Sequence, residues 1–171
     1  MNVGDVIGNM KWLKKPDYGD AASGHQWQTW EAKKPDPRNN KIINSLDVYS
    51  SVNDAGDYQI RLIRSTSPTF TTGEKIKVGS TFGDVRKKFP KIAKIAEYQS
   101  PQFSTKVALF DEQASGIAFE FKLGLDGQVG RREKCLAIWS HEPGLQILNE
   151  LYPAPKYLTQ KPSIQKQGKR P

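Results

Sequence analysis

The chain has 171 residues, with 26 Lys and Arg against 18 Asp and Glu, and a formal net charge of +8. A composition of 36% hydrophobic and 26% charged residues, with a single cysteine, excludes a fully disordered chain, a coiled coil and a disulfide-stabilised scaffold. The longest unbroken apolar run, residues 135–139, is far shorter than the ~20 residues that cross a bilayer, so no transmembrane segment is expected.

Residues 1–15 do not contain the apolar stretch that follows the basic start of a secretory signal. The expected location is therefore the cytoplasm, unless a leader has been removed. In that second case the protein is expected to be periplasmic, associated with the outer membrane or secreted. A single cysteine is compatible with both compartments.

A polar loop at residues 17–25 collects Asp17, Asp20 and His25 and continues into Trp27 and Trp30. A metal site here would need further ligands, which no His or Cys cluster and no calcium-loop spacing supplies, so no metal or other cofactor is expected. The interpretations are an ordinary turn, a loop that binds a ligand or protein partner through these five residues and, ranked last, a metal or catalytic role. On a strand the two tryptophans point to opposite faces, so at least one is expected in the core.

Segments rich in β-branched and aromatic residues predict six strands, at residues 25–32, 45–51, 58–64, 106–111, 116–122 and 134–140. Turn residues at 53–57 join the second segment to the third, and residues 112–115 join the fourth to the fifth. The sequence therefore predicts two antiparallel hairpins.

Residues 82–89 are predicted as a helix, because Thr81 and Asp84 have the spacing of a capping box and Pro90 ends the segment. A second short helix is predicted at residues 144–151. With the strands, these elements predict an α+β fold of antiparallel sheets with one or two short helices.

A short pattern, V-G-x-x-[IF]-G, occurs at residues 3–8 and again at residues 78–83. It indicates an internal duplication of residues 1–70 and 71–155, with chance similarity as the alternative. Because halves of this size are small for independent folding, they are expected to share one core. Residues 1–155 are thus predicted to form a single α+β domain, followed by a basic flexible tail at residues 156–171.

Residues 77–90, with the sequence KVGSTFGDVRKKFP, resemble the opening of small bacterial outer-membrane assembly lipoproteins of the SmpA/OmlA-like group. Residues 13–30 and 63–79 are similar to uncharacterised proteins of Bacteroidota-like bacteria that are secreted or lipid-anchored. These resemblances imply an α+β fold, export from the cytoplasm and no established enzymatic activity.

Residues 156–171 carry five Lys and Arg side chains and no acidic side chain, so they supply most of the net charge. The sequence therefore predicts that positive charge is not gathered on a folded face. The tail is expected either to be solvated or to contact phosphate, an acidic partner or an anionic lipid surface through Lys161, Lys166, Lys169 and Arg170.

Signatures of catalysis are weak along the whole sequence. His141 is predicted as a partly exposed residue at a strand end, and Cys135 as a buried small apolar residue. The nucleophile elbow, the phosphate-binding loop and the dinucleotide-binding fingerprint are all missing. No catalytic residue is therefore assigned, and the protein is not expected to be an enzyme.

These observations favour a non-catalytic binding or protein-interaction domain of the bacterial cell envelope or a secreted protein, which presents the 17–30 loop to a protein partner. The alternative is a basic nucleic-acid-associated protein that uses its C-terminal tail. A small hydrolase ranks third and would require converging carboxylates in a pocket.

Overall fold

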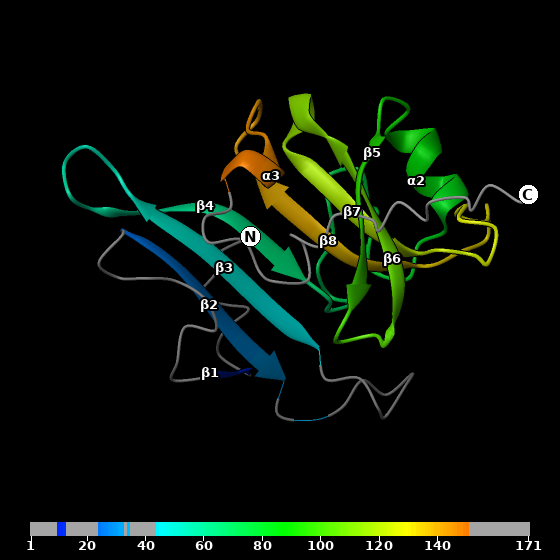
Figure 1. Cartoon of the computed structure of the whole chain (residues 1–171), viewed down its shortest axis with the longest axis horizontal. Helices are drawn as coiled ribbons and strands as arrows, with labels where there is room; N and C mark the ends of the chain where they lie inside the picture. Colours follow the sequence, from blue (N-terminus) through cyan, green and yellow to red (C-terminus); the bar gives the residue numbers. More distant parts are fainter. Residues whose placement is uncertain (1–9, 13–23, 33, 35–43, 151–171) are drawn as a thin grey trace, which may run out of the picture.

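The structure is a computed structural model that describes residues 10–12, 24–32, 34 and 44–150 (Figure 1). The strands are β1 (Met10–Trp12), β2 (His25–Ala32), β3 (Ser45–Val52), β4 (Tyr58–Ser65), β5 (Ala93–Ser100), β6 (Thr105–Glu112), β7 (Ile117–Lys122) and β8 (Cys135–His141). Two short helices, α2 (Phe82–Lys88) and α3 (Ile147–Glu150), and a 3₁₀ turn, η2 (Gln113–Ser115), complete the fold.

All eight strands belong to one antiparallel sheet with the order β1-β2-β3-β4-β8-β7-β6-β5. The sheet consists of two four-stranded meanders, each made of consecutive strands, which join where β4 pairs with β8. The described part of the chain is thus mostly β. The predicted α+β fold holds coarsely, as antiparallel strands with two short helices, but the strands form one continuous sheet where several sheets were predicted.

The six predicted strands and both hairpins are present, with ends within two residues of the predicted ones. Helix α2 has the predicted capping box, in which Thr81 Oγ1 accepts a hydrogen bond from the Asp84 N–H at 3.1 Å. Strands β1 and β5 were not predicted. The first copy of the repeated pattern, residues 3–8, lies outside the described residues.

One face of the sheet is covered by α2 and the segment before it. Val85 and Phe89 from this part of the chain pack on Phe119, Phe121 and other residues of β6 to β8. We call this group the helix-side cluster; its buried members are Ile76, Val78, Val85, Phe89, Ile92, Ala108, Phe110, Phe119, Phe121, Leu123, Cys135 and Ile138.

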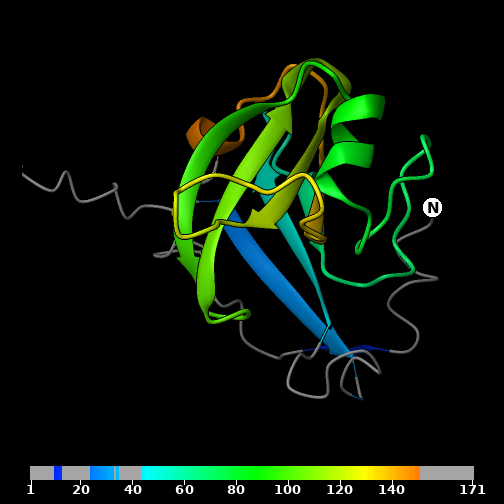
Figure 2. The same cartoon turned by 90° about the vertical axis from the view of Figure 1, so that its right-hand side faces the viewer.

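The opposite face forms a second core, which we call the inner cluster. Its buried members are Trp27, Tyr49, Leu62, Tyr98, Val107, Leu109, Ala118, Trp139, Leu145 and Ile147. Strands from both ends of the sheet contribute to it, because the sheet curves around this face (Figure 2). Gln102, between β5 and β6, reaches across and donates hydrogen bonds to Ser45 and Thr66, both at 3.3 Å. The inner face is therefore closed largely by the sheet itself.

In the described part of the chain, the helices are too short and too polar to cross a membrane.

Candidate binding cleft

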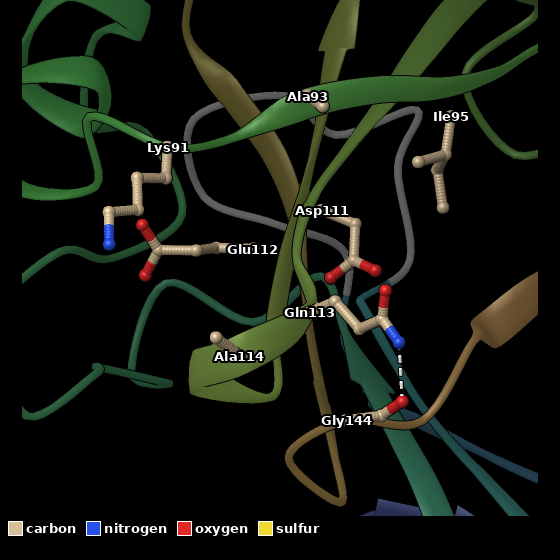
Figure 3. A pocket seen from close by; sticks show the side chains of 8 residues that line it. All are labelled: Lys91, Ala93, Ile95, Asp111, Glu112, Gln113, Ala114 and Gly144. Carbon is tan, nitrogen blue, oxygen red and sulfur yellow. Dashed lines mark hydrogen bonds between the residues drawn. The ribbon is translucent and has the colours of Figure 1, made fainter.

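A cleft lies at the rim of the inner face, between the start of β5, the end of β6 and the segment that follows β8 (Figure 3). It consists of two hollows of about 490 and 320 Å³ that share Ile95, Asp111 and Gln113. The first is also lined by Lys91, Ala93, Glu112, Ala114 and Gly144, and the second by Gln146, Ile147, Leu148 and Asn149.

Strand alternation places Asp111 in this cleft. Val107, Leu109 and Asp111 share the inner face of β6, and all three are buried. The strand ends one residue later, and the η2 turn returns the chain into β7. A carboxylate on an otherwise apolar strand face is the signal by which the sequence could have revealed this residue.

Asp111 is held by His141, which lies on β8. Asp111 Oδ1 is 2.9 Å from His141 Nε2, and His141 Nδ1 is 2.9 Å from the carbonyl oxygen of Glu142. The prediction of a partly exposed His141 is wrong, because pairing with Asp111 keeps the ring buried. The second carboxylate oxygen of Asp111 has no hydrogen-bond partner among the described residues, which leaves an acceptor for a ligand.

The backbone around the cleft is tightly packed. Gly116, which follows η2, has φ +67, and a Cβ on it would lie 2.2 Å from the carbonyl oxygen of His141. Gly144 donates its N–H to the Gln113 carbonyl at 2.8 Å, and the Gln113 side chain in turn donates to the Gly144 carbonyl (Figure 3). These contacts fix the segment after β8 against the end of β6 and so define the cleft wall.

The predicted binding residues are only partly brought together. Asp17 and Asp20 lie outside the described residues. His25 begins β2 and contacts Tyr49, with His25 Nδ1 2.8 Å from the Tyr49 hydroxyl. Trp27 is 4% exposed and packs on Tyr49 and Trp139, which confirms that one of the two tryptophans is a core residue.

Trp30 lies on the other face of β2 and is half-buried. It therefore does not share a surface with Trp27, although both come from the same predicted loop and strand. The tail residues Lys161, Lys166, Lys169 and Arg170 lie outside the described residues, so their predicted contacts remain predictions.

At one end of the molecule, α2 lies beside the loop between β7 and β8 (Figures 1 and 2). Residues 82–91 and 122–134 carry eight Lys and Arg side chains against three Asp and Glu side chains. The prediction that positive charge is not gathered on a folded face is therefore wrong. The sequence did not reveal this arrangement, because the two segments are distant in the chain and become adjacent only in the fold.

A buried charge network, which the sequence did not reveal, spans the centre of the inner face. Arg64 donates to both carboxylate oxygens of Glu120, at 2.6 and 3.0 Å, and to Asp47 at 2.8 Å. Trp139 Nε1 also donates to Glu120, at 2.6 Å. Burial raises the pKa of Asp47, against the lowering effect of Arg64. These carboxylates converge on an arginine inside the core, away from the cleft.

Cys135 is buried in the helix-side cluster, as predicted, and burial raises the pKa of its thiol. A thiol in this environment stays protonated and unreactive at neutral pH. Among the residues that the structure describes, no group of three or more His, Cys, Asp or Glu side chains is placed to hold a metal ion.

No family model and no curated protein matches the chain. Among solved structures, the chain is similar to the uncharacterized protein yfeY from Escherichia coli, with 15% sequence identity and a TM-score of 0.46. The likeness covers 82% of this chain and 86% of that chain. At this level it says nothing about function.

Proposed function

We propose that the protein is a non-catalytic binding domain that holds a segment of a protein partner in the cleft beside Asp111. The observation that carries this proposal is a buried carboxylate, 7% exposed, that lines a cleft and keeps one oxygen available. Binding pockets in proteins typically combine apolar walls with a few well-placed polar groups, and this cleft has both.

The lining of the cleft defines the partner segment. Ile95, Ile147 and Leu148 supply an apolar wall, and Leu148 is 42% exposed. Asp111 and Glu112 supply negative charge, and in Figure 3 the Lys91 and Glu112 side chains point toward one another across the rim. The segment that fits carries a Lys or Arg side chain for Asp111 next to an apolar side chain for the wall.

Photo-crosslinking tests this proposal in the cells that produce the protein. A benzophenone side chain at position 148 lies on the cleft rim, and the same group at position 60 serves as the control, because Ile60 is also exposed, at 52%, but lies on the β3–β4 hairpin. We expect a discrete protein adduct from position 148 and none from position 60.

Asp111→Asn then tests the carboxylate. Asparagine has both an acceptor oxygen and a donor nitrogen, so it can hydrogen-bond to His141 Nε2 in either tautomer, and we expect the fold to be retained while the charge is lost. A hydrogen bond to a charged group contributes about 1.5–3 kcal/mol, so the adduct yield should fall about tenfold or more. Asp54→Asn, in the exposed β3–β4 turn, should leave the yield unchanged. An adduct that is insensitive to Asp111→Asn would contradict the proposal.

We also propose that the domain acts in the bacterial cell envelope or is secreted, as the sequence resemblances imply. Fractionation of the producing cells tests this location, and recovery in the cytoplasm alone would contradict it.

The loop contacts predicted for Asp17, Asp20, His25 and Trp30 are compatible with a second contact area on the same partner, whereas Trp27 serves the core.

The two four-stranded meanders support the proposal that the chain arose by an internal duplication, with its boundary near residue 70. Each meander contributes one central strand, β4 or β8, to the junction. Sequences of relatives in which the two halves are more alike would test this origin directly.

A further inference from the structure

The basic end of the molecule has a defined architecture. The N–H groups of Phe82 and Gly83 donate to the carbonyls of Glu133 and Arg131, at 2.8 and 2.9 Å. Thr81 and Lys134 form an isolated antiparallel bridge. These contacts fix the first turn of α2 against residues 131–134, so that the exposed basic side chains of both segments form one surface. We call it the basic face; its exposed members are Arg86, Lys87, Lys88, Arg131, Arg132 and Lys134.

Three acidic side chains lie in the segments that form this end, Asp84, Asp126 and Glu133, and two of them make local hydrogen bonds. Asp84 accepts hydrogen bonds from Thr81 in the capping box. Asp126 accepts a hydrogen bond from the Gln128 N–H at 3.0 Å. Because eight Lys and Arg side chains outnumber these three acidic side chains in residues 82–91 and 122–134, the net charge of this end is positive.

Leu125 projects from the same end at the tip of the β7–β8 loop. It is fully exposed, and it is held in a tight turn by a hydrogen bond from the Gly127 N–H to the Gly124 carbonyl at 3.0 Å. In Figure 2 this loop lies in front of the sheet, beside α2. The end therefore combines many cationic groups with one apolar side chain on an ordered loop.

We propose that the basic face binds the surface of an anionic phospholipid bilayer, with Leu125 entering the boundary between headgroups and acyl chains. Lysine and arginine near such a surface are each attracted by about 1 kcal/mol, and an apolar side chain adds affinity when it leaves water. This inference is independent of the partner proposed for the cleft.

Leu125 favours a bilayer over a nucleic acid as the occupant. Phosphate contacts in nucleic acids use cationic and hydrogen-bonding side chains, and bases are bound by aromatic stacking. The aromatic residues of this end, Phe82 and Phe89, pack in or against the helix-side cluster instead. An exposed leucine has no role in contacts with phosphate, whereas it has one at a lipid interface.

Co-sedimentation of the full chain with vesicles tests the proposal. The probes are vesicles of phosphatidylcholine alone and vesicles in which a third of the lipid is phosphatidylglycerol, at an ionic strength of about 0.1 M. We expect binding to the anionic vesicles and little binding to the neutral ones. Equal binding to both, or none to either, would overturn the proposal.

Two variants separate the charged and the apolar contributions. Arg131→Ser with Arg132→Ser should lower the partition coefficient about 25-fold, because about 1 kcal/mol per charge is a factor of five. Leu125→Ser should lower it about tenfold. Tyr58→Ser, which removes an exposed apolar side chain from the β3–β4 hairpin, is the matched control and should have no effect.

Two further measurements can overturn the assignment of the surface. A variant with serine at Lys161, Lys166, Lys169 and Arg170 should retain most of the binding. If it loses all binding while the Arg131 and Arg132 variant does not, the tail binds the lipid.

A fluorescent DNA duplex is the second probe. Two results together would assign the basic face to nucleic acid instead. The first is DNA binding that is lost in the double variant Arg131→Ser with Arg132→Ser. The second is vesicle binding that is unchanged by Leu125→Ser.

Discussion

The two faces of the sheet are built on different principles. The helix-side cluster is apolar, and phenylalanine rings pack on one another in and against it. The ring centroid of Phe82 lies 4.9 Å from those of Phe110 and Phe121. The inner cluster surrounds Arg64 and two carboxylates. A helix covers the first face, and packing of apolar side chains excludes water from it. The second face is closed by the curvature of the sheet, and hydrogen bonds between distant strands hold that curvature.

This difference shows how paired charges can specify the geometry of a curved sheet. The network joins β3, β4, β7 and β8, and Arg64 also donates a hydrogen bond to Gln102 in the β5–β6 turn. It therefore links both meanders and the hairpin that closes over them. Apolar side chains alone would tolerate several curvatures, whereas hydrogen-bonded charges tolerate few.

The largest expected effect comes from removing the centre of the network. Arg64→Met leaves the carboxylates of Asp47 and Glu120 buried without their cation, and should lower the free energy of unfolding by about 3–5 kcal/mol. Urea denaturation measures this loss. The triple variant Asp47→Leu, Arg64→Met and Glu120→Gln should recover most of it, because no charge is left in the network. If Arg64→Met alone is neutral, the network does not stabilise the inner face.

Closure of the inner face by backbone contact predicts the next largest effect. Gly116→Ala places a Cβ against the His141 carbonyl at a positive φ, and should cost about 2 kcal/mol or more in unfolding free energy. Gly56→Ala is the matched control, because Gly56 also has a positive φ, +86, but a Cβ there has open space. Equal losses in urea denaturation would mean that the rim is looser than described.

A conservative change on the helix side should cost less than either. Phe119→Leu keeps an apolar side chain of similar size in the helix-side cluster, and should lower the free energy of unfolding by about 1 kcal/mol. The same urea denaturation measures it. A loss as large as that of Arg64→Met would remove the contrast between a face that tolerates apolar replacement and one that does not.

The smallest expected effect is a pair of opposite pH dependences. Burial raises the pKa of Asp47 above its ordinary value of 3.8, whereas hydrogen bonds from Thr81 lower the pKa of Asp84. The stabilisation from Asp84 is therefore present above pH 3.8 and lost as pH falls through its native pKa. The contribution of Asp47 is largest below pH 3.8 and lost as pH rises through its native pKa.

Unfolding free energies of three proteins at about pH 3 and pH 7 test these signs. Relative to the unsubstituted protein, Asp47→Asn should gain stability as pH rises, and Asp84→Asn should lose it. Shifts in the same direction would show that Asp47 is stabilised as an anion by Arg64 more than it is disfavoured by burial.

Local patterns accounted for much of the fold. Capping by Thr81 and alternation in residues 25–32 depend on neighbours in the chain, and both were predicted. Strand β5 was missed because a bulge between Lys94 and Ala96 interrupts its alternation and because edge positions such as Lys94 are polar and exposed. Strand β1 has only three residues, which is too short for a periodic pattern.

The candidate site was less predictable, because it depends on pairs that are distant in sequence. His141 is buried by Asp111 from another strand, and Glu120 is matched by Arg64 from the other meander. Neither partner can be read from local spacing. The basic face was missed for the same reason, since α2 and residues 131–134 meet only after folding.

The strand order has a consequence for the speed of folding. Most neighbours in the sheet follow one another in the chain and can pair early. Strand β4 is complete at Ser65, but its partner β8 begins only at Cys135. Closing so long a loop costs entropy before any contact offsets it, so the central junction should form last and limit the folding rate. During synthesis, the first meander must wait with one edge open until almost the whole described chain has been made.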